Sequence, residues 1–288
     1  MIFLHDLLRF QFLQYAVLAG ALAAVAGGVV GSLVVVRRTT YLAGAISHCV
    51  LAGLGLARYL QRGCGIAWFT PMLGAALAAV AAAGLISWLT VRHRQRTDTA
   101  LSIVWAVGMA IGVSFLAATP GYQDDLMSYL FGSILLVDPA ELALMAGLDV
   151  LVLAVIGLFY NQFLAIGFNA DHARLRGVRV ALFETIFLVL TALTVVLLVK
   201  VSGIVLALAL LTLPAATAGL LVRRLVPMMA TAAGICFAVT VGGLALSYRP
   251  EWPPGATIVE VAAAGYLAAV GIRRLREQAR RRAGQADG

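Results

Sequence analysis

Charged residues are scarce in this sequence. Only 12% of its 288 residues are Asp, Glu, Lys or Arg, whereas 62% are hydrophobic and the mean hydropathy is +0.98. A soluble domain carries about twice that charged fraction. Apolar runs of about 20 residues recur between short charged segments, and no alternating strand pattern argues for a β-barrel. The sequence therefore predicts an all-α, polytopic helical membrane protein.

Cysteines and catalytic motifs are also scarce. The three cysteines, Cys49, Cys64 and Cys236, are too few and too widely spaced for a disulfide framework. The pattern GxxxxGK followed by Ser or Thr is missing, so the chain has no loop that cradles the phosphates of ATP. The HExxH and GxSxG patterns of hydrolases are missing as well. We therefore expect that the chain is not itself an enzyme and has no tightly bound cofactor.

The apolar runs predict about nine membrane spans in a single domain of residues 1–288, of which 273–288 form a basic tail. The predicted spans are Tyr15–Val36, Thr40–Tyr59, Ile66–Val91, Thr99–Ala118, Ala140–Tyr160, Val180–Val199, Ile204–Val222, Val226–Leu246 and Ala256–Ile272. A tight hairpin at Lys200–Gly203 would join the sixth span to the seventh. Eight spans are the alternative, and residues 200–225 are also compatible with two half-helices. Leu126–Val137 is too short to cross, which predicts a re-entrant or interfacial helix.

Basic residues are distributed unevenly around the predicted spans. The net charge is +8, and most of the 21 Lys and Arg residues would lie on one side of the membrane. They gather at Arg37–Arg38, Arg92–Arg96, Arg174–Arg179 and Arg223–Arg224 and in the tail. Because positive charge is retained in the cytoplasm, this side is predicted to be cytoplasmic, with the N-terminus outside and the C-terminus inside. Such an asymmetry accounts for the charge without a nucleic-acid partner.

His48 is the most informative polar residue of the predicted spans. It lies in the stretch Thr40–Gly55 and is the only one of four histidines deep inside a span. A titratable ring in hydrocarbon is costly, so it faces the bundle interior or a wet pathway. His48 is therefore either a packed residue that donates to a neighbouring helix carbonyl or a ligand on an ion path. Positions 44, 45, 48, 51 and 52 share one helix face, on which His48 is the only polar residue.

Three acidic residues also lie within predicted spans. Asp149 is near the middle of the fifth span, where an unpaired carboxylate is expensive, so a partner or a wet cavity is expected. Both a pathway role and a structural hydrogen-bonding role remain open for it. Glu184 is about one turn inside the cytoplasmic end and is predicted to snorkel or to pair with Arg179. Glu260 lies near the outer end, and both glutamates are interpreted as structural.

A polar segment, Asn169–Val178, separates the fifth and sixth spans on the predicted cytoplasmic side. Asn169 is a candidate N-cap, Asp171 would lie in the first helical turn, and Gly177 is a candidate end of the helix. The composition fits either an ordinary loop or a short helix that docks a soluble partner.

Short motifs occur in a fixed order along the chain. They are Val36-Arg37-Arg38 with Ile46-Ser47-His48, Asp98-Thr99-Ala100, Ser128–Leu135, Asp171-His172-Ala173 with Gly177, and Leu210–Ala218. From about Gln11 to Arg274 the sequence resembles the membrane-spanning permease subunits of bacterial ATP-binding-cassette importers for zinc, manganese and iron. The resemblance implies a type II importer-like permease that crosses the bacterial inner membrane several times and contacts lipid.

The resemblance also implies partners. These are a second permease subunit, in a homo- or heterodimer, ATP-binding-cassette ATPase subunits below it, and an extracytoplasmic metal-binding protein that delivers a divalent transition metal ion. ATP hydrolysis would reside in the ATPase subunits. Coupling to the ATPase is expected at Asn169, Asp171, His172, Ala173, Arg174 and Gly177.

The family places a transit ligand for the metal at the position of His48. Many members have Asp four residues earlier, where this sequence has Gly44, so a second ligand must come from Asp149 or from a twofold-related His48. Imidazole favours zinc, with manganese and iron as the other candidates. Two other classes remain: a scaffold without a transport role, or a self-contained metal or proton transporter with His48 and Asp149 as its relay. Pro214 marks one candidate helix break, whereas secondary transporters often carry paired breaks.

Overall fold

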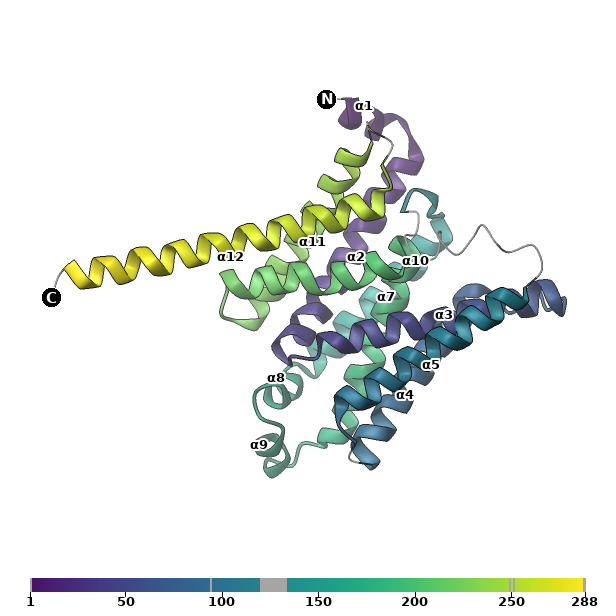
Figure 1. Cartoon of the computed structure of the whole chain (residues 1–288), viewed down its shortest axis with the longest axis horizontal. Coiled ribbons are helices and arrows are strands. Elements are labelled where there is room, and N and C mark those ends of the chain that lie inside the picture. Colours follow the sequence, from purple (N-terminus) through teal and green to yellow (C-terminus); the bar gives the residue numbers. More distant parts are fainter. Residues whose placement is uncertain (1, 94, 120–133, 249, 251, 287–288) are drawn as a thin grey trace.

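The computed structural model describes residues 2–93, 95–119, 134–248, 250 and 252–286. All regular structure within these residues is helical, as predicted. The helices are α1 (Ile2–Arg9), α2 (Gln11–Val36), α3 (Thr40–Gly63), α4 (Pro71–Ser87), α5 (Thr97–Ala118), α7 (Pro139–Leu158), α8 (Tyr160–Phe168), α9 (Ala170–Leu175), α10 (Val180–Leu221), α11 (Leu225–Ser247) and α12 (Pro254–Ala286). A π-helical turn, Trp88–Arg92, continues α4, and a 3₁₀ turn, Ile134–Leu136, precedes α7. Figure 1 shows one helical bundle from which the end of α12 projects.

Nine segments of the described chain are long and apolar enough to cross a membrane, which confirms the predicted number. Two of them, Val180–Val199 and Ser202–Leu221, belong to α10. Gly203 interrupts the helical geometry between them, with φ 77° and ψ 170°, a backbone conformation that is open essentially to glycine alone. The predicted hairpin at Lys200–Gly203 is therefore a bend at one residue, after which α10 runs in a new direction (Figure 1).

The second half of α10 continues as one helix through Pro214, rather than as two half-helices. Proline has no N–H, so the carbonyl of Leu210, four residues earlier, lacks its helical donor. The Sγ of Cys236 on α11 donates to that carbonyl at 3.8 Å. Cys236 thus satisfies the group that Pro214 leaves free and fastens α11 to α10.

Glycines allow close approach at two helix seams. On α2, a Cβ added at Gly28 would lie 2.5 Å from the backbone nitrogen of Ala233 on α11. On α5, a Cβ at Gly108 would lie 2.8 Å from the Cα of Cys49, and one at Gly112 would lie 2.7 Å from the α3 backbone. Side chains are not tolerated at such distances. Close van der Waals packing of this kind holds helices together in lipid, which supplies no hydrophobic drive between them.

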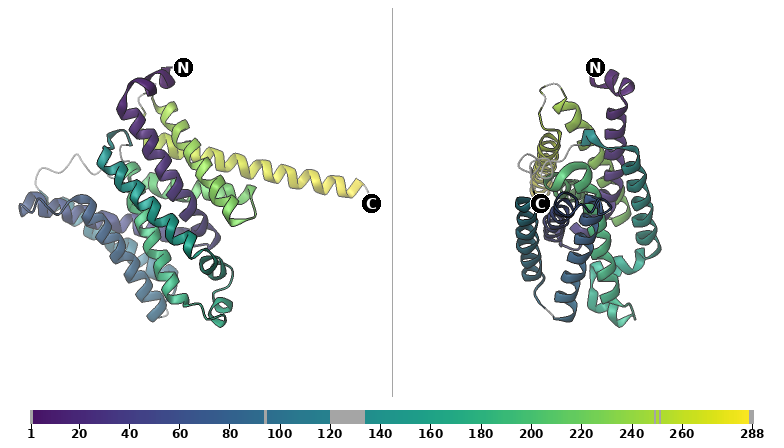
Figure 2. Two further views of the ribbon diagram at one scale, coloured as in Figure 1. Left: turned by 180° about the vertical axis from the view of Figure 1, so that it is seen from behind. Right: turned by 90° about the vertical axis from the view of Figure 1, so that its right-hand side faces the viewer.

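Contacts between distant segments define the two ends of the bundle. At one end the hydroxyl of Tyr248, just after α11, donates to Asp6 of α1 at 3.0 Å. At the other end Arg37, just after α2, lies 3.6 Å from Glu184 near the start of α10. The chain start and the α11–α12 connection therefore share one end, whereas α8 and α9 lie at the other (Figures 1 and 2). This is the alternation expected of successive spans.

Several predicted boundaries are wrong. The third span begins at Pro71 rather than Ile66, because Thr70 Oγ1 accepts the N–H of Leu73 at 3.3 Å and proline suits the first helical position. The fifth span ends at Leu158, and after a break at Phe159 the chain forms α8, which no sequence pattern predicted.

Two further expectations concern the end of the last helix and the predicted re-entrant helix. The last helix continues past Ile272 to Ala286, because the residues that follow are mainly strong helix formers. Most of the predicted re-entrant helix Leu126–Val137 falls outside the described residues. Of its described residues, Ile134–Val137, the first three form the 3₁₀ turn Ile134–Leu136.

Candidate functional site

His48 lies on α3 and faces α5. Its ring stacks on that of Trp105, with centroids 4.7 Å apart and planes 9° from parallel. The ring is half-buried, and its Nδ1 is buried without a hydrogen-bond partner among the described residues. A Cβ added at Gly44 would lie 3.9 Å from Leu208 and 4.0 Å from Trp105, which is ordinary contact. The imidazole therefore stacks on an aromatic ring, and the space beside Gly44 has room for a small side chain.

Asp149 lies on the buried stripe of α7. Its side chain is 4% exposed, and neither carboxylate oxygen has a hydrogen-bond partner in the part of the chain that the structure describes. Buried residues precede and follow it by about one turn, namely Met145 and Val152. An ionised carboxylate in such surroundings is costly. Asp149 is thus a polar group that the surrounding helices leave unsatisfied.

The structure does not bring His48 and Asp149 together. Helices α3 and α5 lie on the near side of the bundle in Figure 1, whereas α7 lies on the far side (Figure 2). α3 packs mainly on α4, α5 and α10, and α7 packs mainly on α2. Among the described residues no group of three or more His, Cys, Asp and Glu side chains could hold a metal ion. The described residues of one protomer thus leave His48 and Asp149 as separate polar groups rather than as parts of one metal site.

The predicted polar segment forms the short helix α9 at the end of the bundle. Asn169 is its N-cap, because the side-chain oxygen accepts the N–H of His172 at 3.0 Å. Arg174 and Asp171 form an exposed ion pair at 3.4 Å. Gly177 follows the helix with φ 81°, a left-handed conformation that favours glycine. The capping and the end of this helix confirm the prediction from the residues.

Ala173 differs from its expected place on the docking face. It is only 1% exposed and packs with Ile166 of α8 and Val180 of α10. It therefore anchors α9 to the membrane helices. The exposed surface around α9 instead carries two apolar side chains that the sequence analysis missed. They are Leu175 at the end of α9 (87% exposed) and Phe168 at the end of α8 (80% exposed). Large apolar residues in an otherwise polar segment are the signal that would have identified them.

Arg37 is a second functional candidate that was missed. Its guanidinium lies 3.6 Å from the Glu184 carboxylate and 4.3 Å from the ring centroid of Phe187, both on α10. The side chain is only 11% exposed. Burial lowers the pKa of Arg37, and the nearby Glu184 opposes that shift. The expected pairing of Glu184 with Arg179 is thus wrong, because Arg179 is exposed just before α10 begins whereas Arg37 lies against it.

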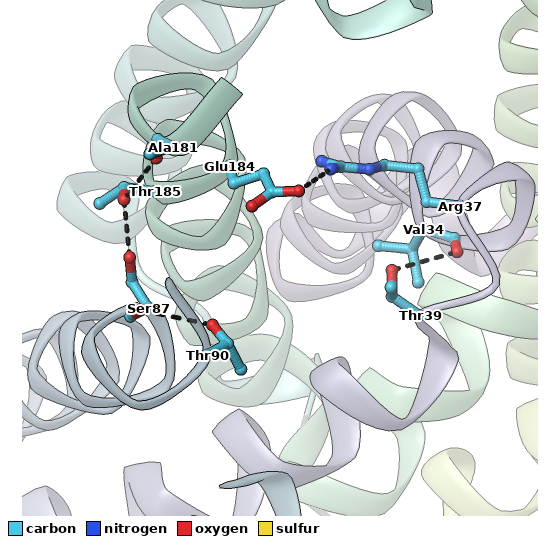
Figure 3. A network of polar contacts seen from close by, with 8 residues as sticks. All are labelled: Val34, Arg37, Thr39, Ser87, Thr90, Ala181, Glu184 and Thr185. Carbon is cyan, nitrogen blue, oxygen red and sulfur yellow. Dashed lines mark hydrogen bonds and ion pairs between the residues drawn. The ribbon is translucent and has the colours of Figure 1, made fainter. Parts of the chain in front are cut away.

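A hydrogen bond ties α4 to the same part of α10. The Ser87 and Thr185 hydroxyl oxygens are 2.7 Å apart, and Thr185 also donates to the carbonyl of Ala181 at 2.9 Å. Figure 3 shows this bond and the Arg37–Glu184 pair on adjacent residues of α10. The first turns of α10 are therefore linked to α2 and α4. Since α9 leads directly into α10, a displacement of α9 would act on both.

Comparison with known proteins shows which family the chain resembles. Residues 9–273 match the ABC 3 transport family. An uncharacterized membrane protein of Synechocystis sp. is 39% identical over 267 residues, 93% of this chain and 92% of that protein. The manganese transport system membrane protein MntC of Listeria monocytogenes is 31% identical over 262 residues, 91% of each chain. The solved structure of PsaBC from Streptococcus pneumoniae in complex with Fab aligns with a TM-score of 0.81 and 28% identity, over 93% of this chain and 95% of that one.

These similarities cover almost the whole described bundle. The chain belongs to the ABC 3 transport family and is a membrane-spanning permease of that family.

Proposed function

We propose that this permease forms a dimer that carries a divalent transition metal ion into the cytoplasm by alternating access. Partner ATPase subunits would drive the cycle, and an extracytoplasmic metal-binding protein would deliver the ion. The observation that carries the proposal is the family match over residues 9–273 in a chain without an ATP-binding motif. Because the matched family is an ABC transport family, the ATP that drives uptake would be bound by another chain. This favours the ABC importer over a self-contained secondary transporter.

The charge pattern supports the orientation. Arg37, Arg38, Arg223 and Arg224 follow spans that end on the same side as α9, and positive charge is retained in the cytoplasm. We therefore place α8, α9 and the C-terminus in the cytoplasm and the α1 end outside the bacterial inner membrane. The delivery protein would dock at the α1 end, and the ATPase would dock at α9.

His48 is the proposed transit ligand of this path. Stacking on Trp105 fixes the plane of the imidazole, and the unsatisfied Nδ1 is free to bind an ion. No group of three or more His, Cys, Asp and Glu side chains forms around it among the described residues, so a matching imidazole from the second subunit would complete the site. Imidazole ligands suit zinc better than manganese, which prefers oxygen. Zinc is our first candidate, and manganese is the second because of the name of the Listeria relative.

Uptake by reconstituted vesicles tests the role of His48. With the ATPase and delivery protein present, His48→Ala should lower zinc uptake by about tenfold or more, as for other altered metal sites. Cys49→Ala, one residue along the same helix, is the matched control and should retain uptake. Parent-like transport by His48→Ala, with loss of uptake when the ATPase is inactivated, would show that His48 is structural.

A second variant tests the choice of ion. Gly44→Asp would place a carboxylate one helical turn from His48, and its Cβ has room beside Leu208. This added oxygen ligand should raise manganese uptake relative to zinc uptake. An unchanged ratio of the two rates would argue that residue 44 does not contact the ion.

The exposed face of α9 tests the docking of the ATPase. Leu175→Asp adds a charge to a side chain that is 87% exposed, so the permease should fold normally while ATPase association falls. Leu8→Asp is the matched control, because Leu8 is 84% exposed and lies on α1 at the opposite end. Copurification of the ATPase and its stimulation by the permease are the measurements. Equal effects of both variants would remove α9 as the docking site. Ala173→Arg is less informative, because Ala173 is buried.

A further inference from the structure

A groove of about 620 Å³ lies between the end of α10 and the last helix, outside the regions discussed above. Helix α12 packs only on α10 and α11 among its main neighbours and runs beside the second half of α10 (Figure 1). The α10 wall of the groove consists of Gly219, Leu220 and Leu221, with Arg223 just beyond. Most of this surface would face lipid in the membrane.

The α12 wall of the groove changes from small residues to charged residues along its length. The lining residues in order are Gly265, Ala268, Ala269, Ile272, Arg273 and Glu277, which recur at helical spacing and so share one face. Small side chains come first and charged ones last. A Cβ added at Gly265 would meet no described atom within 4 Å, so the small end is open. From Gly265 to Arg273 the helix rises about 12 Å, which is less than the roughly 15 Å of hydrocarbon in one leaflet.

The charged end of the groove carries two arginines, one from the segment after α10 and one from α12. Arg223 follows α10, and Arg273 lies in the last turns of the α12 span. Glu277 also lines this end, and its carboxylate lies 2.9 Å from Arg273, with both side chains 54% exposed. Arg224 and Arg274 are exposed next to them in the sequence. Positive charge therefore exceeds negative charge where the groove meets the water.

We propose that this groove binds an anionic phospholipid of the leaflet on the arginine side. Arg223 and Arg273 would hold the headgroup phosphate, since guanidinium groups donate paired hydrogen bonds to phosphate oxygens. One acyl chain would lie along the small residues of α12. The groove combines an apolar inner part with basic residues at the membrane surface. This combination fits a lipid better than a free anion, because a free anion would leave the apolar part of the groove unfilled. Basic pockets of this kind between transmembrane helices recognise anionic headgroups.

Native mass spectrometry of the full-length permease, extracted from vesicles of phosphatidylglycerol or of phosphatidylcholine, measures the retained lipid. Phosphatidylglycerol should be retained preferentially. Arg223→Gln and Arg273→Gln should each lower its retention by roughly fivefold, and the pair by about thirtyfold. Arg224→Gln with Arg274→Gln is the matched control, since it removes the same charge outside the groove. Glu277→Gln should raise retention about twofold by releasing Arg273.

A steric pair of variants tests the apolar part separately. Gly265→Leu fills the groove and should displace the lipid, whereas Gly271→Leu, on the same helix but outside the groove, should not. Equal loss from both arginine pairs would mean general surface charge and would overturn the proposal. Equal retention of both lipids, or displacement by inorganic phosphate alone, would overturn it too. The same spectra report dimer and ATPase masses. If the Arg223 and Arg273 variants reduce those masses but leave lipid unchanged, the groove belongs to a protein interface.

Discussion

The two candidate functional regions of this permease are built in different ways. On the α3–α5 seam, packing holds His48: its ring stacks on Trp105, glycines bring the backbones together, and Nδ1 has no partner among the described residues. At the end of the bundle beside α9, polar contacts hold α10: Arg37 pairs with Glu184, and Ser87 bonds to Thr185. One region is held by close packing, whereas the other is cross-linked by polar contacts.

This difference fits the two tasks proposed for these regions, ion passage and coupling to the ATPase. An ion path must release what it binds, so an imidazole that is oriented by stacking and lacks competing hydrogen bonds suits it. A coupling region must move as a unit, so contacts that fix α2, α4 and α10 to one another suit that task. Changes beside α9 should therefore affect stability and communication with the ATPase, and changes on the seam should affect ion passage and helix packing.

Removal of Arg37 should have the largest effect on the cross-linked region. Arg37→Ala leaves Glu184 without its partner and removes the contact with the Phe187 ring, so we expect a loss of about 2 kcal/mol of stability. That is below the usual range for buried pairs because Glu184 is 36% exposed. Thermal unfolding in detergent and ATPase-coupled uptake are the measurements. The neighbouring exposed arginine provides the control Arg38→Ala, and equal losses in both variants would contradict the contrast between the two regions.

The glycine seam should give an effect of similar size. Gly112→Ala forces a Cβ to within 2.7 Å of the α3 backbone, so the helices must separate at a cost of about 1–3 kcal/mol. Separation would also move Trp105 away from His48 and lower uptake. Gly147→Ala on α7 is the matched control, because nothing described lies within 4 Å of its added Cβ, and alanine there should stabilise the helix slightly. Similar melting temperatures for the two variants would show that α3 and α5 are not held by close packing.

The length of the hydrophobic runs and the charged segments between them were sufficient to predict the nine spans. Residue type was sufficient to predict the N-cap at Asn169. Such patterns depend only on neighbours in the chain. They do not reveal that Arg37 would reach Glu184, because that pair joins two helices distant in sequence. The break occurs at Phe159, whereas the nearest glycine, Gly157, lies inside α7, so the sequence did not separate α8 from the fifth span. Similarly, composition alone could not show that Ala173 points inward.

The same limit applies to the candidate path. His48 was identified because a titratable side chain in a span is rare. Its stacking partner Trp105 lies on another helix. An aromatic residue in a span can face either lipid or a neighbouring helix, so the sequence does not indicate this contact. Asp149 was identified by the same rule as His48, yet the fold places it on the opposite side of the bundle. Residue chemistry therefore predicts which groups are unusual, and only the packing shows which of them meet.

The smallest expected effect concerns the bond between α4 and α10. Thr185 already donates its proton to the carbonyl of Ala181, so Ser87 must be the donor to Thr185. After Thr185→Val, the Ser87 hydroxyl can turn to a carbonyl of its own helix, as serines commonly do. We therefore expect single-variant losses below about 1 kcal/mol and a coupling energy near 0.6 kcal/mol in a double-mutant cycle of Ser87→Ala with Thr185→Val.

The matched cycle uses Thr90→Val in place of Ser87→Ala. The hydroxyl of Thr90 donates to the Ile86 carbonyl within the same stretch of helix, at 2.8 Å, so its loss should add to that of Thr185→Val without coupling. Unfolding midpoints of the four proteins in each cycle provide the measurement. A zero coupling energy for both pairs would mean that packing, rather than the hydroxyl pair, joins α4 to α10. In that case the ion pair at Arg37 would be the only cross-link left between α10 and its neighbours in Figure 3, and the contrast with the seam would rest on it alone.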